Sequence, residues 1–214
     1  MADYLYDIFV SYETDWLVSN WLKDHFLPFL QTWVRNTVPE ICKRPARPIF
    51  FARSQVEIGF PQELKLRLAG IKPGVKWDEG LREGLRFSRC LIAIVNPPYF
   101  YSDPCKMEWE SFQRRSDGTE KTAILPVLYY DGDSFPDIAR YPQRIDLSNF
   151  ALDGEALRNG KLYLEFQQMM RLVAQRAAET ILNAPDFQEW QAEENPQPAA
   201  PPPHVGLPRY ADAR

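Results

Sequence analysis

The sequence has few of the residues that carry the commonest enzyme chemistry. It has only two histidines, His25 and His204, and three cysteines, Cys42, Cys90 and Cys105, without a Cys-x-x-Cys spacing. This composition argues against a histidine-centred metal or acyl-transfer site, a zinc site and a disulfide framework. We therefore expect no metal, and any chemistry must rest mainly on carboxylates.

The chain also lacks a basic surplus and a long apolar run. Its 214 residues carry a formal net charge of −4, so it has no electrostatic footprint for nucleic acid. No apolar run approaches the roughly 20 residues of a membrane span, and the N-terminus enters a strand-like pattern too early for a signal peptide. We expect a cytoplasmic protein with no nucleic-acid partner and no membrane contact.

Apolar patterning predicts strands that alternate with helices. The predicted strands are residues 4–12, 47–52, 90–95, 122–130 and, more weakly, 144–150, and the predicted helices are 16–34, 76–89, a helix that includes residue 108, and 160–182. This alternation predicts an α/β fold, a flavodoxin-like doubly wound, mainly parallel five-stranded sheet with helices on both faces. Pro126 implies that the fourth strand lies at an edge or carries a bulge. His25, inside the first helix, is expected at the surface or partly buried.

The chain is long enough for one domain with a proper core, and a second full domain is not expected. We assign this domain to residues 1–183 and a proline-rich, extended or disordered tail to residues 184–214. The tail could be a polyproline II recognition segment, but the preferred interpretation is a tail without a dedicated partner.

Three motifs follow the carboxyl ends of successive predicted strands. They are "FVSY" at residues 9–12, "ARSQVEIGF" at 52–60 and "NPPYFYSDPCKMEW" at 96–109. A doubly wound sheet brings such ends together, and ligands bind there. These motifs predict a single functional site at that edge.

In their order and spacing these motifs resemble those of the Toll/interleukin-1 receptor (TIR) domain family, over residues 4–182. The family has a Phe-Ile/Val-Ser-Tyr/His end on its first strand, a loop with a glycine after its second, and a Ser/Asn-Pro-x-Tyr turn after its third. The stretch "CKMEWESF", residues 105–112, is similar to the Cys-x-x-Glu-Trp segment of a bacterial TIR-like group.

In the family's enzymes, the glutamate of this last segment is the catalytic residue of an NAD+ glycohydrolase, and it falls on Glu108. The resemblance implies an NAD+ nucleosidase that takes NAD+ as its substrate without a further cofactor, with ADP-ribose or a cyclic product both open. It also implies self-association through TIR–TIR contacts, a separate sensor or activating protein, and a role in bacterial immune (anti-phage) signalling.

A single carboxylate suits this chemistry. Nicotinamide leaves as a neutral heterocycle, so no general acid is needed, and a carboxylate beside the ribose stabilises the oxocarbenium cation. We expect Glu108 in the first turns of its helix, where the helix N-terminus keeps a carboxylate ionised. The alternative is an acid that merely complements the helix dipole. Glu110, Arg114 and Arg115 are expected to form a solvated face.

The resemblance implies further residues of the nucleotide cleft: Ser11, Tyr12, Arg53, Glu57, Ser102 and Cys105. Ser11 and Tyr12 match cleft-lining positions, although a strand-end Ser-Tyr pair could simply cap the next helix. Arg53 could reach a pyrophosphate and Glu57 a ribose hydroxyl, whereas exposed loop charges are usually only solvated. Cys105, with no histidine nearby, is better explained as a small packed residue than as a nucleophile.

Two positions depart from the family pattern. Pro104 stands where the family commonly has a tryptophan, and Ala52 where an acidic residue often ends the second strand. Both favour a second hypothesis, a non-catalytic TIR adaptor or scaffold that acts by homotypic association, whereas Glu108 favours the enzyme. A receiver-type phosphoacceptor domain is disfavoured because the first strand does not end in adjacent aspartates. The aromatic residues that could replace the missing tryptophan as a stacking wall are Tyr99, Phe100 and Trp109.

Overall fold

A parallel sheet of six strands, in the order β3-β2-β1-β4-β5-β6, forms the centre of the molecule. The computed structural model describes residues 3–51, 68–69, 76–116, 122–130, 144–152 and 154–188. The strands are β1 (Tyr6–Tyr12), β2 (Ile49–Phe51), β3 (Leu68–Ala69), β4 (Ser88–Val95), β5 (Ile124–Leu128) and β6 (Ile145–Asp146). The predicted flavodoxin-like fold with five central strands is confirmed, and the two-residue β3 adds a strand at one edge.

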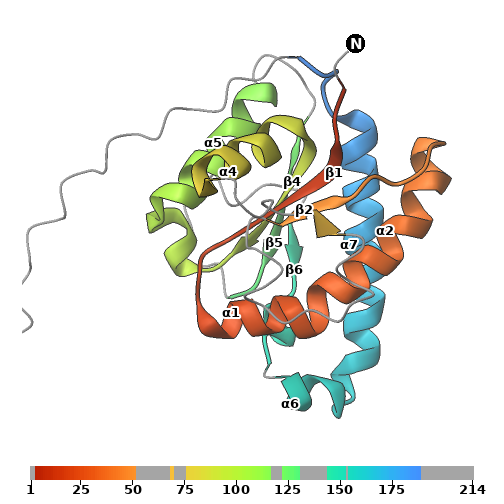
Figure 1. Cartoon of the computed structure of the whole chain (residues 1–214). Coiled ribbons are helices and arrows are strands. Elements are labelled where there is room, and N and C mark those ends of the chain that lie inside the picture. The colour runs from red at the N-terminus through yellow and green to blue at the C-terminus, as the bar shows by residue number, and fades with distance from the viewer. Residues whose placement is uncertain are drawn as a thin grey trace, which may run out of the picture.

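Helices cover both faces of the sheet (Figure 1). One face carries α1 (Trp16–Trp21), η1 (Leu22–Phe26, a π-helical segment), α2 (Leu27–Cys42) and α7 (Leu162–Asn183), and the other carries α4 (Trp77–Phe87) and α5 (Asp103–Ser116). The other short helices in the described part of the chain are η2 (Pro97–Tyr101), η4 (Ser148–Phe150) and α6 (Gly154–Arg158). Among the described residues, no helix is long and apolar enough to cross a membrane.

The alternation of side chains along β1 divides the core into two parts. Ile8, Val10 and Tyr12 pack on the α2 and α7 face, whereas Phe9 packs against the α4 and α5 face. Because successive strand residues point to opposite faces, Ser11 shares the α5 face with Phe9. The last two residues of the "FVSY" motif therefore serve different layers.

The first helical region is longer than the sequence predicted. The Asp15 carboxylate accepts hydrogen bonds from two backbone N–H groups at the start of α1, and α2 continues through Pro39 to Cys42. Lys43 ends α2 in the left-handed conformation, with φ of 55°. His25 is 0% exposed, so the prediction of a surface or partly buried position is wrong. It lies in η1, close to aromatic rings of α7.

The prediction that Pro126 places its strand at an edge or in a bulge is wrong, because β5 lies between β4 and β6 and pairs with β4 residue by residue through Pro126. The N–H of Tyr129 bonds to β4, whereas the carbonyl of Leu128 accepts from the chain beyond β6. By this alternation the nitrogen of Pro126 faces the β6 side, where strand pairing begins only at Val127. The N–H group that proline lacks would therefore point to a place where β6 has not yet begun, so no strand hydrogen bond is lost.

Arg115 does not belong to a solvated face, which corrects the sequence prediction. Its side chain is buried, and its guanidinium donates to the carbonyls of Leu85 and Ser88 at 2.6 and 2.8 Å. Burial lowers its pKa to about 10. It therefore ties α5 to the junction of α4 and β4, whereas Glu110 and Arg114 are exposed as predicted.

Residues 184–188, which the sequence assigned to the tail, contact the domain. The Tyr4 hydroxyl donates to the carbonyl of Pro185 at 3.0 Å, and the Phe187 ring lies 5.1 Å from the Tyr4 ring and 5.7 Å from the Phe87 ring. Packed structure therefore continues beyond α7 to this segment. The rest of the predicted tail lies outside the described residues.

Candidate functional site

Glu108 lies at the carboxyl edge of the sheet, where β1 and β4 are neighbours. In the sheet, β1 lies between β2 and β4, so the chain adds strands first on one side of β1 and later on the other. This is the topological switch point, at which open α/β sheets bind ligands. Ser11 near the end of β1, Tyr99 in η2 and Glu108 in α5 come together there.

The Glu108 carboxyl group is the end of a buried hydrogen-bond chain. Its side chain is 6% exposed, and the Ser11 hydroxyl donates to its Oε2. The Tyr99 hydroxyl lies 2.7 Å from Ser11 Oγ. Since Asp15 caps α1, the alternative that Ser11 caps this helix is wrong. Three separate elements therefore hold Glu108 in one position.

Burial raises the pKa of Glu108 to about 8; the Ser11 hydrogen bond lowers it, and the negative charge of Glu13 raises it further. The prediction that the helix start keeps Glu108 ionised is therefore wrong. α5 begins at Asp103, so Glu108 lies in the second turn, where the helix dipole is weak. Desolvation is the stronger effect there.

Cys105 lies one helical turn before Glu108 and is buried. Its Sγ donates to Oε2 of Glu13 at 3.7 Å. Burial, and then the negative charge of Glu108, raise the pKa of this thiol, while a hydrogen bond with Ser102 lowers it. These features agree with a packed thiol rather than a nucleophile. Ser102 lies directly before α5, and its carbonyl accepts the N–H of Lys106 at 3.0 Å.

Tyr12 is a predicted site residue that lies away from Glu108. Tyr12 is buried on the opposite face of the sheet, where its ring stacks on that of Phe51 with centroids 5.3 Å apart. The structure therefore brings Ser11 to Glu108 and does not bring Tyr12 there. Arg53, Glu57 and Ala52 lie outside the described residues.

Pro104 is the second residue of α5, a position at which the missing N–H has no helical partner in any case. The rings of Phe100 and Trp109 are 5.6 Å apart, and that of Tyr99 is 5.2 Å from Phe100. Tyr99 and Trp109 are buried, whereas Phe100 is partly exposed. Of these three aromatic residues, Phe100 alone is partly exposed, and it packs against the core on the α5 face.

Sequence reasoning missed two polar residues at this edge. Glu13 directly follows β1 and is partly exposed, and Asn96 directly follows β4 and is buried. Asn96 Oδ1 has no hydrogen-bond partner among the described residues. Both residues sit at a strand's carboxyl end, and this position is the signal that could have identified them.

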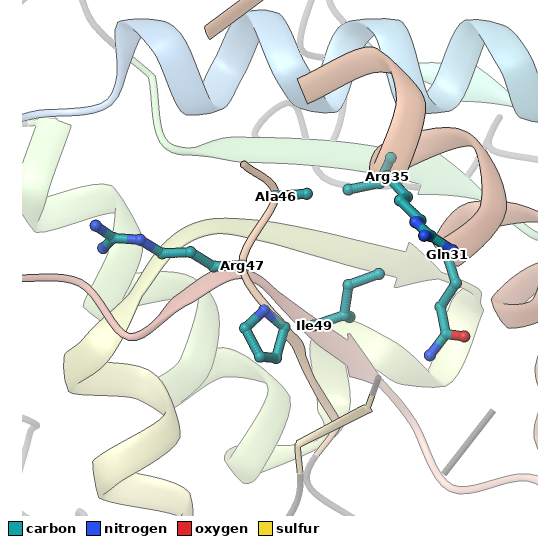
Figure 2. A pocket seen from close by; sticks show the side chains of 7 residues that line it. Gln31, Arg35, Ala46, Arg47 and Ile49 are labelled. Atoms are coloured by element: carbon teal, nitrogen blue, oxygen red, sulfur yellow. The ribbon is translucent and has the colours of Figure 1, made fainter. Parts of the chain in front are cut away.

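A pocket of about 310 Å³ lies at the other edge of the sheet, where the chain enters β2 (Figure 2). Its lining residues are Gln31, Val34, Arg35, Ala46, Arg47, Pro48 and Ile49. Figure 2 shows the Arg47 side chain directed away from Ile49, and its guanidinium bonds to Asp3 at 2.6 Å. Because no lining residue belongs to the group around Glu108, this pocket is separate from it. No group of three or more potential metal ligands occurs among the described histidine, cysteine and acidic residues.

Comparison with known proteins agrees with this architecture. Residues 63–159, a segment that contains β4, η2 and α5 with Glu108, match the family model of the TIR domain. A search of the curated proteins finds no match. Among solved structures, the chain is similar to the TIR domain of the Toll-related receptor TRR-2 from the lower metazoan Hydra magnipapillata. That similarity has 15% identity over 77% of this chain and 98% of that chain, but its TM-score of 0.35 is too low to carry weight. The family match thus supports a TIR domain over residues 63–159, the part of the chain that carries Glu108.

Proposed function

We propose that the protein is an NAD+ nucleosidase that cleaves the bond between nicotinamide and ribose, with Glu108 as its catalytic residue. The observation that carries this proposal is the Glu108 carboxyl group, buried at the switch point of the sheet and held there by the Ser11 hydroxyl. A lone helix-surface acid would not need such a hydrogen-bond chain. NAD+ is the substrate, and the reaction requires no further cofactor.

In this reaction the C1′–N bond breaks and its electron pair leaves with nicotinamide, so a positive charge develops on the ribose. An ionised Glu108 stabilises that cation. Ser11 fixes Oε2 and so determines the direction in which the carboxylate faces. Attack by water on C1′ gives ADP-ribose and releases a proton, and attack by the adenine ring gives a cyclic product.

The buried, protonated state of Glu108 fits a resting form. With a pKa raised to about 8, Glu108 carries a proton at neutral pH, and a neutral carboxyl group stabilises a cation poorly. We propose that self-association through TIR–TIR contacts, induced by a separate sensor protein, opens the site. The Cys105–Trp109 segment is the reason to place this activity in bacterial immune signalling.

The test is nicotinamide release from NAD+ by purified protein that is concentrated or tethered to force assembly. Glu108→Ala should lower the rate at least about a hundredfold, because the charge that stabilises the transition state is lost. Glu108→Gln, which keeps the shape, should lose activity equally. Glu110→Ala removes an exposed carboxylate from the same helix and should leave the rate unchanged, with thermal melting to check that each variant folds. An active Glu108→Ala protein, or an assembled wild type that leaves NAD+ intact, would disprove the proposal.

The burial of Glu108 also favours a second candidate function, a non-catalytic TIR adaptor that acts by homotypic association. In such a protein Glu108 would stay buried and protonated in the assembled form as well. It would self-associate, fail to consume NAD+, and retain its association after Glu108→Ala. The same assembly experiment, read by light scattering and by NAD+ consumption together, separates the two functions.

A further inference from the structure

The Tyr99 hydroxyl belongs to the buried hydrogen-bond chain of Glu108, yet the proposed mechanism assigns it no role. Tyr99 lies in η2, is 0% exposed, and its hydroxyl oxygen is 2.7 Å from Ser11 Oγ. Edge-on contacts hold its ring against those of Phe100 and Trp109, with centroids 5.2 and 6.3 Å apart. The hydroxyl is therefore fixed in place, one hydrogen bond from Ser11 and two from the Glu108 carboxyl group.

Ser11 determines the direction of this chain, because a serine hydroxyl has a single hydrogen to donate. It donates that hydrogen to Oε2 of Glu108. In the bond between Ser11 and Tyr99 either oxygen could be the donor by position alone, so the donor must be Tyr99. Burial raises the pKa of Tyr99 well above its usual value, and the phenol keeps its hydrogen at neutral pH. The chain therefore runs from Tyr99 through Ser11 to Glu108.

The reverse direction would leave a buried donor without an acceptor. A protonated Glu108 could donate to Ser11, and Ser11 could then donate to Tyr99. The phenol hydrogen would need a further acceptor, and within the described part of the chain Ser11 is the only hydrogen-bond partner of the Tyr99 hydroxyl. A buried donor without a partner is unfavourable. Tyr99 thus favours the forward direction, in which Glu108 is an acceptor, as it is when ionised or when its proton lies on Oε1.

The other titratable groups that act on this chain do not favour an ionised Glu108. Glu13, directly after β1, raises the pKa of Glu108 by its negative charge. Cys105 of α5 is neutral at pH 7, because burial raises the pKa of its thiol. The hydrogen bond from Ser11 is the interaction that lowers the pKa of Glu108 against burial. Tyr99 supports this one bond.

We propose that Tyr99 is a positioning residue, which directs the hydrogen of Ser11 to the Glu108 carboxyl group and thereby favours the ionised form of Glu108. The inference rests on the proposed function, in which the ionised carboxylate stabilises the positive charge on the ribose. Tyr99 bonds to Ser11 and not to Glu108, so it acts through the serine. It supplies no group to the reaction itself.

The test is Tyr99→Phe, which removes the hydroxyl and keeps the ring that packs on Phe100 and Trp109. Without the phenol, Ser11 is free to rotate and to accept a hydrogen bond from a protonated Glu108. The ionisation constant of Glu108 should then fall about threefold, so its titration moves to higher pH by about half a unit. Carbon-13 NMR of the glutamate carboxyl groups in the full chain, assigned with Glu108→Gln, measures this shift.

Tyr4→Phe is the matched control. It removes another buried tyrosine hydroxyl, which donates to the carbonyl of Pro185 at 3.0 Å near the start of β1. Thermal melting should show a similar small loss of stability in Tyr4→Phe and Tyr99→Phe, whereas the titration of Glu108 should move in Tyr99→Phe alone. Equal titrations of Glu108 in these two variants, or a titration in Tyr99→Phe that matches the wild type, would overturn the inference.

A double variant tests whether Tyr99 acts through Ser11. In a Ser11→Ala protein the chain is already broken, so the further change Tyr99→Phe should leave the titration of Glu108 where Ser11→Ala alone has placed it. A shift of the same size with and without the Ser11 hydroxyl would mean that Tyr99 acts on Glu108 by another route. The positioning role would then be wrong.

The outcomes separate this inference from the proposed function, because the titration is measured without NAD+. A shifted Glu108 titration in Tyr99→Phe, together with an assembled wild type that leaves NAD+ intact, supports the positioning role and disproves the nucleosidase. In an active protein, the acid limb of the pH–rate profile should move upward by the same half unit in Tyr99→Phe. NAD+ cleavage with identical profiles in the two proteins would support the nucleosidase and disprove the positioning role.

Discussion

Two buried carboxyl groups, Asp7 near the start of β1 and Glu108 beside its end, have very different hydrogen-bond partners. Asp7 is 0% exposed and meets the Arg44 guanidinium with both oxygens, at 2.5 and 3.2 Å. It also accepts the backbone N–H of Arg47 at 2.7 Å. Glu108 is nearly as buried, yet its hydrogen-bond donor is the neutral hydroxyl of Ser11.

The difference separates a structural acid from a candidate functional one. A buried charge that faces a cation and an N–H group is compensated, and it fixes β1 to the chain that enters β2. A buried carboxyl group without a cation stays protonated or strains the fold, and such groups concentrate at functional sites. The contrast between the two ends of β1, Asp7 at one and Glu108 of α5 beside the other, is the strongest argument from the structure that Glu108 serves a purpose other than stability.

The largest expected effect is at the entry end of β1. Arg44→Met leaves the Asp7 carboxylate buried without its cation, and we expect the free energy of unfolding at pH 7 to fall by about 3 kcal/mol. Urea denaturation of the two proteins measures this difference. Arg176→Met is the control, because Arg176 pairs with Glu179 on the surface and should change stability by less than about 0.5 kcal/mol. Equal effects of the two substitutions would contradict the structural role of Asp7.

At the exit end of β1, removal of the charge should stabilise the protein. The folded pKa of Glu108 is raised from 4.5 to about 8, so between these values the unfolded chain loses a proton that the folded chain keeps. The wild type therefore loses stability as pH rises through this window, and none of this loss is present below it. Glu108→Gln should match the wild type near pH 5 and exceed it by about 3 kcal/mol near pH 8.

Denaturation curves at these two pH values test the sign as well as the size of the effect. Glu110→Gln, at an exposed position of the same helix, should show no such dependence on pH. A wild type that is as stable as Glu108→Gln at pH 8 would mean that Glu108 is ionised and well solvated in the folded chain. The comparison with Asp7 would then fail.

The sequence predicted the fold better than it predicted the environment of the site. The unbroken apolar run at 90–95 indicates a buried strand, the run at 122–130 indicates a strand in spite of Pro126, and the alternation of strands and helices then restricts the topology. The state of Glu108 was not predictable in this way, because its pKa depends on burial by residues distant in sequence. The prediction that Arg115 is solvated was wrong for the same reason, because its hydrogen-bond acceptors are the carbonyls of Leu85 and Ser88, where α4 meets β4.

Ser11 and Glu13 show the same limit within one motif. The sequence suggested Ser11 as a cleft residue, but a helix cap was equally consistent until the structure assigned that role to Asp15. Glu13 belongs to no family motif, and its contact with Cys105 and its effect on the pKa of Glu108 connect it to the site. Residue type and spacing identify candidates, whereas the partner of each side chain is a property of the folded chain.

The smallest predicted effect concerns Ser11. Ser11→Ala removes the donor to Glu108 and the partner of the Tyr99 hydroxyl, and we expect a loss of about 1 kcal/mol in the free energy of unfolding. Because the Ser11 hydrogen bond lowers the pKa of Glu108, its loss should move the titration of Glu108 to higher pH than about 8. Carbon-13 NMR of the glutamate carboxyl groups, assigned with Glu108→Gln, measures this shift.

The control is Ser111→Ala, which removes a buried hydroxyl from α5 itself. This hydroxyl donates to the carbonyl of Met107, so its loss should leave the Glu108 titration unchanged. If the two serine variants titrate alike, Ser11 acts only by packing, and Glu108 then lacks the hydroxyl partner on which its comparison with Asp7 depends.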